Sequence, residues 1–267
     1  MRPTAKASNT SLNNKNDMSD VLLVTGSSGI AAATARLWGA HARVFIVGVK
    51  EEECRALSAE LPDAEFSVAD VRDEEAIRKS VAACCQRFGK IDALFNVAGI
   101  SARSLGDGPL HECKGEAFDT AMNVNAKGTF LTCREVLANW MRSSHTGAIL
   151  NCGSVLAQRP EREHFATVGY AASKGAIEAM SLSAAAYYAP AGIRINVIAP
   201  GLVLTPMSRR AQEDAGVMEY IAHKQPLTRG MLTAEDVAKT ACFLLGKESR
   251  PITGQVITVD GGWTVSA

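Results

Sequence analysis

The segment Val21-Leu22-Leu23-Val24-Thr25-Gly26-Ser27-Ser28-Gly29-Ile30-Ala31 joins an apolar run to a helical pattern through a glycine turn. Residues 21–25 are rich in valine and leucine, which indicates a short buried strand. Counting from Ile30, the positions i+3, i+4, i+7 and i+8 end at Trp38 and share one face of a helix. The segment therefore predicts a strand that passes directly into a helix, the repeating unit of an α/β protein.

The rest of the chain repeats this alternation. Short β-branched runs separate longer segments of helical period, a pattern typical of βα units and a mostly parallel sheet. Right-handed crossovers make such a chain a doubly wound sheet, which binds ligands beyond the carboxyl ends of its strands. The expected helices cover residues 30–38, 73–88, 116–141, 170–188 and 234–245, and the expected strands cover 21–25, 44–48, 65–69, 91–96, 148–152, 194–198 and 255–259.

Length and composition suit one large α/β domain. The chain has 267 residues, of which 47% are hydrophobic and 21% charged. Its formal net charge is +0, so no global field would gather nucleic acid or an anionic membrane. No apolar run approaches the roughly 20 residues that span a bilayer. We expect a polar, flexible tail over residues 1–19, a single folded domain over 20–267, and a cytoplasmic location.

The cysteines and histidines indicate neither a disulfide framework nor a metal site. Seven cysteines and five histidines are scattered along the chain without a CxxC pair. Such a set suits reduced thiols better than bridges or zinc ligands. We therefore expect no metal.

The glycine turn after the first expected strand has the context of a phosphate-binding loop. Gly26 and Gly29 let the backbone approach an anion, and the unpaired amides and dipole of a helix start favour that anion. An ordinary tight βα turn is the alternative interpretation. At the same sheet edge, Asn96-Val97-Ala98-Gly99 closes the fourth expected strand. Asp70 follows the third, where it suits either an adenine contact or the N-cap of the next helix.

Tyr170 and Lys174 carry the strongest chemical signal. Four residues advance about 400° along a helix, so the phenol and the ammonium project from nearly the same side. A neighbouring cation favours the phenolate form of a tyrosine, which makes the phenol useful in proton transfer. Ser154 follows the fifth expected strand, where its hydroxyl can donate to a substrate carbonyl oxygen. The alternatives are an ordinary helix tyrosine, a solvated lysine and a serine that caps a turn.

Together these features resemble the classical short-chain dehydrogenase/reductase family over residues 20–267. The resemblance implies a Rossmann-type, three-layer α/β/α sandwich around a seven-stranded parallel sheet in the order 3-2-1-4-5-6-7, assembled as a homotetramer or homodimer. The motifs that carry it are the glycine turn, Asn96-Val97-Ala98-Gly99, Asn125 within residues 123–128, Ser154, the YxxxK pair of Tyr170 and Lys174, Pro200-Gly201 followed by Thr205, and the closing residues 253–263.

The resemblance also implies roles for individual residues. Tyr170 would be the general acid/base, Lys174 would hold the nicotinamide ribose, Ser154 would orient the carbonyl, and Asn125 would anchor a proton-relay water. The activity would interconvert a secondary alcohol and a ketone with NAD or NADP. The expected cofactor-binding residues are Gly26, Ser28, Gly29, Ile30, Lys50, Asp70, Val71, Asn96, Ala98, Gly99, Tyr170, Lys174, Pro200, Gly201, Val203 and Thr205.

Two departures from the family pattern concern the cofactor. The family turn is TGxxxGxG, whereas here only two residues separate Gly26 from Gly29 and Ala31 replaces the last glycine, which would displace one amide of the phosphate cradle. The second expected strand ends without the acid that usually meets the ribose of NAD. Lys50 follows it instead and could meet a 2′-phosphate, so NADP is slightly favoured. The alternative is that Lys50 only caps or solvates the next helix.

Two further segments could shape the substrate site. Residues 158–164 form a charged insertion before Tyr170, which would suit a hydroxylated or anionic substrate or else be merely solvated. Residues 205–225 correspond to a helical flap whose Met207, Met218 and Tyr220 could contact substrate or simply pack. A different class of function stays open: a dinucleotide-binding sensor or scaffold of weak catalytic power on the same fold. An epimerase or dehydratase is less favoured.

Overall fold

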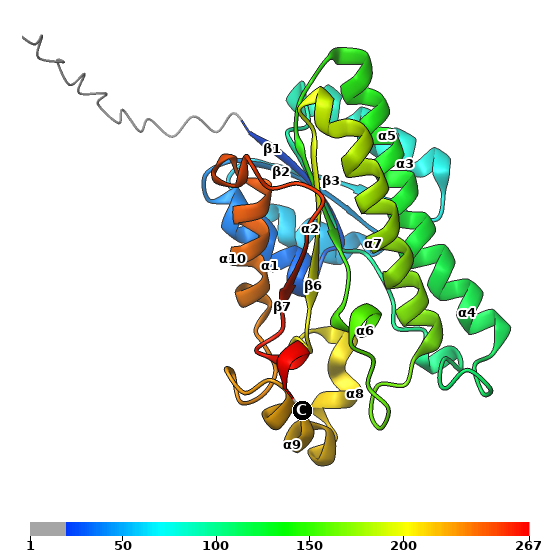
Figure 1. Ribbon diagram of the computed structural model, residues 1–267. Helices are drawn as coiled ribbons and strands as arrows, with labels where there is room; N and C mark the ends of the chain where they lie inside the picture. Colours follow the sequence, from blue (N-terminus) through cyan, green and yellow to red (C-terminus); the bar gives the residue numbers. More distant parts are fainter. Residues whose placement is uncertain (1–19, 267) are drawn as a thin grey trace, which may run out of the picture.

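A computed structural model describes residues 20–266 and contains one seven-stranded parallel sheet (Figure 1). Its strand order is β3-β2-β1-β4-β5-β6-β7, which confirms the expected topology. The polar tail expected over residues 1–19 lies outside the described residues. All seven expected strands are present. Their bounds are β1 Val21–Thr25, β2 Arg43–Gly48, β3 Ala64–Val68, β4 Ala93–Asn96, β5 Ala148–Cys152, β6 Arg194–Pro200 and β7 Val256–Val259.

The bounds of β4 and β6 differ from those expected from the sequence. β4 begins at Ala93, and just before it Asp92 bonds twice to the neighbouring strand β1: its amide donates to the Val21 carbonyl at 2.9 Å, and its side chain accepts from the Val21 amide at 2.8 Å. β6 continues to Pro200, which is in register with Val259 of β7. This extension carries the chain directly to the ligand edge of the sheet.

Helices cover both faces of the sheet. One face carries α1 (Gly29–Gly39), α2 (Glu51–Ala59) and α10 (Ala234–Leu245), and the other carries α3 (Glu74–Phe88), α5 (Gly128–Ser143) and α7 (Val168–Tyr188) (Figure 1). All five residues of β1 are buried between the two layers. A fully buried apolar side chain of this size contributes roughly 1.5–3 kcal/mol relative to exposure, so this central strand anchors the fold.

The helix expected over residues 116–141 is interrupted. It consists of α4 (Gly115–Ala121), a π-helical turn η2 (Met122–Lys127) and α5. Asn125 lies within the π-helical turn and is fully buried, with its side chain bonded to the backbone of Ile100 and to the Ser173 hydroxyl. Such turns occur frequently at functional sites, and this one turns a polar side chain toward the ligand edge.

Several short elements lie beyond the carboxyl ends of β5, β6 and β7, at the bottom of Figure 1. Val155, Val217, Ile221 and Trp263 form a small apolar cluster that holds them together. The 205–225 segment therefore has a packed side as well as an open one. The remaining elements are η1 Arg103–Leu105, α6 Val155–Gln158, η3 Ala189–Ala191, η4 Pro206–Ser208, α8 Arg209–Gln212, α9 Ala215–Lys224, η5 Lys247–Ser249 and η6 Trp263–Val265.

Within residues 20–266, no helix combines the length and the apolar character needed to cross a membrane. The same residues contain no group of three or more histidine, cysteine, aspartate or glutamate side chains placed to hold a metal ion.

Candidate active site

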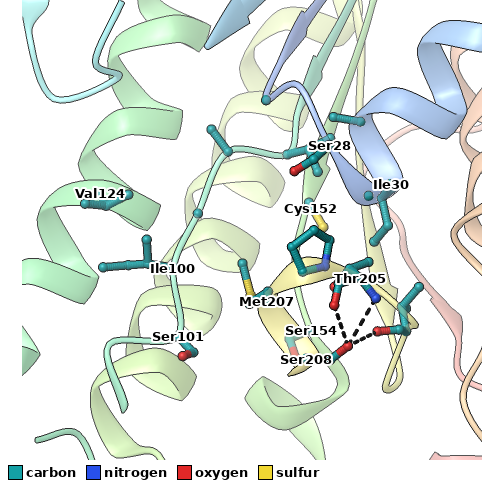
Figure 2. Close-up of a pocket in the computed structure, with 18 of the residues that line it drawn as sticks. Ser28, Ile30, Ile100, Ser101, Val124, Cys152, Ser154, Thr205, Met207 and Ser208 are labelled. Atoms are coloured by element: carbon teal, nitrogen blue, oxygen red, sulfur yellow. Dashed lines mark hydrogen bonds between the residues drawn. The ribbon is translucent and has the colours of Figure 1, made fainter. Parts of the chain in front are cut away.

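A cavity of about 840 Å³ opens at the carboxyl ends of the strands. Its upper part in Figure 2 is formed by Ser28 and Ile30 from the start of α1, and Ser154 and Met207 lie below them. One cavity thus joins the expected phosphate loop to the expected catalytic serine. The expected residues that line it are Gly26, Ser28, Gly29, Ile30, Lys50, Asp70, Val71, Ala98, Gly99, Ser154, Tyr170, Lys174, Pro200, Gly201, Val203 and Thr205.

Two expected site residues lie beneath the cavity and do not line it. Asn96 is buried, and its amide donates to Asn151 Oδ1 at 2.9 Å and to Cys133 Sγ at 3.2 Å. Asn125 reaches the cavity only through its neighbours, because its side-chain oxygen lies 2.9 Å from the position of a Cβ on Gly99. Any larger residue at position 99 would therefore collide with Asn125. Both asparagines support the cavity floor through hydrogen bonds.

The shortened glycine turn still delivers the start of α1 to the cavity. Gly26 donates its amide to the Val47 carbonyl at 2.7 Å, and α1 begins at Gly29. The first turn of α1 has no acidic residue and no side-chain cap from Ser28, so its amides can receive an anion. A Cβ on Gly29, whose φ is +54°, would lie 2.9 Å from Thr205 Cγ2. The turn therefore fits the pyrophosphate of a dinucleotide, although Ala31 is buried where the family has glycine.

The residues expected around adenine and ribose are engaged with their neighbours. Asp70 accepts from Arg72 at 2.6 Å, and this hydrogen bond lowers the pKa of Asp70. It does not cap the following helix; Asp73 does so by accepting from Ala76. The alternative interpretation of Asp70 as the N-cap is therefore wrong.

Lys50 forms an ion pair with Glu53 in the first turn of α2. Its ammonium lies 2.8 Å from the Glu53 carboxylate, whose pKa this hydrogen bond lowers. Glu53 also accepts from the Ser27 hydroxyl at 2.9 Å and lines the cavity. The start of α2, directly after β2, thus places both a cation and a carboxylate where a ribose would bind.

Lys174 is held at the floor of the cavity beside Tyr170. The side chain is buried, and its ammonium donates to the Cys152 carbonyl at 2.7 Å. The same nitrogen lies 5.6 Å from the centroid of the Tyr170 ring. Among the described residues only this carbonyl is bonded to the ammonium, which leaves further donor capacity directed at the cavity. The two side chains therefore share one side of α7, as their spacing predicts.

Ser154 caps a short helix and also lines the cavity. Its hydroxyl oxygen caps α6 by accepting from the Leu156 amide at 3.2 Å, and the residue lines the cavity. Accepting this bond leaves the hydroxyl proton to be donated elsewhere. Ser154 can therefore hold α6 and still donate to a ligand oxygen.

Asp107 anchors the start of the helix that carries Tyr170. This buried carboxylate accepts from the amides of Gly169 and Tyr170 at 2.9 Å and 2.8 Å. The N-cap residue of α7, Thr167, makes no side-chain cap bond of its own. Asp107, which lies in a loop distant in sequence, therefore caps α7 in place of Thr167 and fixes the backbone of Tyr170.

Two arginines line the other end of the cavity. Arg103 belongs to η1 and Arg210 to α8, and both donate to the carbonyl of His164. The charged side chains of the 158–164 insertion do not line the cavity, whereas Phe165 just after it does. In the flap segment Met207 lines the cavity, whereas Tyr220 packs against His164 and Trp263. The positive charge on this part of the cavity thus comes from two short elements that are far apart in the sequence.

Comparisons with known proteins agree with this architecture. A family model described as Enoyl-(Acyl carrier protein) reductase matches residues 24–264. The chain is 34% identical to a glucose 1-dehydrogenase of Gluconobacter oxydans, covering 91% of each chain. It is 35% identical to a 2-(R)-hydroxypropyl-CoM dehydrogenase of Xanthobacter autotrophicus, covering 92% of this chain and 99% of that one. A crystal structure of an actinorhodin polyketide ketoreductase variant with NADPH superposes with a TM-score of 0.83 at 29% identity, covering 92% and 98%.

Proposed function

The chain belongs to the short-chain dehydrogenase/reductase family of oxidoreductases, and on this premise we propose that it interconverts a secondary alcohol and a ketone, with Tyr170 as the general acid/base. One observation carries the proposal: the Lys174 ammonium, buried and 5.6 Å from the Tyr170 ring centroid, lines the same cavity as Ser154 and the glycine turn. This geometry brings a proton-exchanging phenol, a cation and a hydroxyl donor into one cavity with the glycine turn.

In this proposal, each residue acts on the substrate oxygen or on its neighbour. Ser154 donates a hydrogen bond to the oxygen and orients it. Tyr170 takes the proton from the alcohol, or returns it to the ketone oxygen. Lys174 places its ammonium beside the Tyr170 ring and would hydrogen-bond the ribose of a bound dinucleotide. The side-chain amide of Asn125 is already used by Ile100 and Ser173, so a relay water would bind at its backbone carbonyl.

A nicotinamide dinucleotide, when bound, supplies or accepts the hydride. Residues of the glycine turn would hold its pyrophosphate, with Asp70 and Val71 beside the adenine. Pro200, Gly201, Val203 and Thr205 would line the nicotinamide. Support for this assignment comes from the uncapped start of α1 and the close approach of Gly29 to Thr205. A ketoreductase of the same fold is known with NADPH.

For the choice of dinucleotide, we propose NADP through a contact between Lys50 and the 2′-phosphate. The support is the position of Lys50 at the end of β2 and its highly exposed side chain. Glu53 opposes a phosphate dianion and would have to release Lys50. The balance between these two side chains therefore sets the preference.

We also propose a homodimer or homotetramer built on α5 and α7. Phe130 on α5 and Leu182 and Tyr187 on α7 are exposed to 44%, 43% and 74% respectively. Exposed apolar side chains on two helices of one sheet face suit burial against a partner's helices. Light scattering tests it, and a monomeric mass at micromolar concentration would contradict it.

The experiment that tests the activity is the substitution Tyr170→Phe. The purified variant and the wild type are compared in turnover of polyols, keto acids and cyclic ketones, and in NADH and NADPH binding by fluorescence. We expect binding to persist while turnover falls about 100- to 10,000-fold, the usual contribution of an acid/base group. Tyr188→Phe, which changes the last residue of the same helix, is the matched control and should turn over normally. Dinucleotide binding without turnover in the wild type would favour the sensor function instead.

A further inference from the structure

Arg103 and Arg210 converge on a single backbone oxygen at one end of the cavity. Their Nη2 atoms lie 3.0 Å and 3.1 Å from the carbonyl oxygen of His164, so the two nitrogens are within about 6 Å of each other. Arg103 also donates to the Ala166 carbonyl at 3.4 Å. Two guanidinium groups therefore bind neutral carbonyl oxygens of residues 164 and 166, although one guanidinium would be enough to hold this loop.

The neighbouring carboxylates do not neutralise this pair. Glu161 accepts from the amides of residues 163, 164 and 165, and these bonds outweigh burial, so the pKa of Glu161 lies below its usual value. Asp107 is turned toward the start of α7. Among residues 20–266, no carboxylate lies within salt-bridge distance of Arg103 or Arg210. Burial lowers the pKa of Arg103 and the adjacent Arg210 lowers it further, and together they outweigh the opposing effect of the Asp107 and Glu161 carboxylates.

The backbone of this region holds Arg103 in place. Ala102, which precedes it, is buried and has a φ of +53°, a left-handed conformation unusual for alanine. The amides of Leu105 and Asp107 both donate to the Ala102 carbonyl, at 2.9 Å and 3.3 Å, and maintain this turn. Strain of this kind persists where the surrounding structure fixes a side chain for use.

From these contacts we infer that Arg103 and Arg210 bind a carboxylate on the substrate, at the end of the cavity away from the glycine turn. Planar guanidinium groups match a carboxylate with parallel hydrogen bonds. Phe165 and Trp263, whose ring centroids are 5.6 Å apart, line the cavity nearby and would contact an apolar body. The inference rests on the proposed function and narrows its substrate to an apolar hydroxy or keto acid with the carboxylate remote from the reacting carbon.

The test measures binding separately from turnover. Calorimetric titration of the full chain, with and without NADP⁺, compares cyclohexanecarboxylate with the neutral cyclohexanecarboxamide and with cyclohexyl phosphate. We expect the carboxylate to bind at least about 10-fold more tightly than the amide, because only the carboxylate forms hydrogen bonds with the guanidinium groups in which both partners are charged. Equal affinities would overturn the inference. Tightest binding of the phosphate ester would overturn the carboxylate assignment.

Neighbouring arginines on α8 provide a matched pair of variants. Arg210→Gln should reduce the carboxylate-to-amide affinity ratio about 10-fold, and Arg209→Gln, which alters an exposed arginine outside the cavity lining, should leave the ratio unchanged. Arg103→Lys keeps the charge but loses the planar fork, so we expect an intermediate ratio. The same ratio in Arg210→Gln and Arg209→Gln would refute the site.

Turnover distinguishes failure of this inference from failure of the proposed function. The wild type is assayed with 4-oxocyclohexanecarboxylate and its carboxamide. Turnover of both ketones at equal efficiency would refute the carboxylate site alone. Tight carboxylate binding with no reduction of any ketone would refute the oxidoreductase proposal and leave the binding site standing.

Discussion

Asp107 offers a quantitative test of how the catalytic helix is held. Its buried carboxylate accepts two hydrogen bonds from the first amides of α7, at 2.9 Å and 2.8 Å, and one of these amides belongs to Tyr170. Asp107→Ala removes both acceptors without altering α7 itself. The variant therefore isolates what a distant loop contributes to the helix.

The expected loss of stability is about 2–4 kcal/mol. An unsatisfied buried donor costs about 1–3 kcal/mol, and two donors lose their partner. Removal of a negative charge from a helix N-terminus adds about 0.3–2 kcal/mol. Water entering near Tyr170, which is only half-buried, offsets part of this total. Asp107→Asn retains one acceptor oxygen, so it should lose about half as much.

Urea denaturation followed by circular dichroism measures the free energy of unfolding. The control is Asp73→Ala, which removes the exposed N-cap of α3 and its single bond to Ala76 at 3.0 Å. We expect this control to lose about 1 kcal/mol. If Asp107→Ala loses no more than Asp73→Ala, then the carboxylate does not anchor α7 and the reasoning is wrong.

Three further substitutions test charged side chains: Glu53 and Lys50 line the cavity, and Glu178 lies behind Gly153. Glu53→Gln should free Lys50 and tighten NADPH binding about 2- to 5-fold, whereas Lys50→Ala should weaken NADPH binding. Fluorescence titration measures both affinities, with NADH as the comparison. Equal changes in affinity for NADH and NADPH would refute the contact between Lys50 and the 2′-phosphate. Burial raises the pKa of Glu178 above its ordinary 4.5, so the folded chain binds this proton more tightly than the unfolded chain does, and the resulting stability is lost as pH rises through the raised value. Glu178→Gln should therefore gain stability relative to wild type between about pH 4 and pH 7 in urea denaturation, and a pH-independent difference would contradict this.

The fold could be predicted from the sequence because its signals are local. Most strands are short apolar runs, and β3 alternates apolar with polar residues, so the sequence predicts all seven strands to within a few residues. The π-helical turn at Met122–Lys127 escaped prediction. Its cause is the long-range bonding of Asn125 to Ile100 and Ser173, which leaves the helical period of the sequence unchanged.

The sequence predicts a cavity residue when that residue directly follows a strand or lies one helical turn from another site residue. Ser154, Tyr170 and Lys174 meet this condition. Arg103 and Arg210 do not, because they come from separate short elements and meet only at the carbonyl of His164. The sequence suggested an anionic substrate from the charged insertion, whereas the charges that line the cavity lie elsewhere.

We propose that Tyr170, assisted by Lys174, transfers the proton in the reaction. The most direct test of this proposal is single-turnover hydride transfer, followed by NADPH absorbance in stopped flow, at saturating dinucleotide and a ketone that the wild type reduces. We expect Tyr170→Phe to bind NADPH with unchanged affinity and to transfer hydride at least about 100-fold more slowly. Transfer at the wild-type rate in this variant would contradict the proposal.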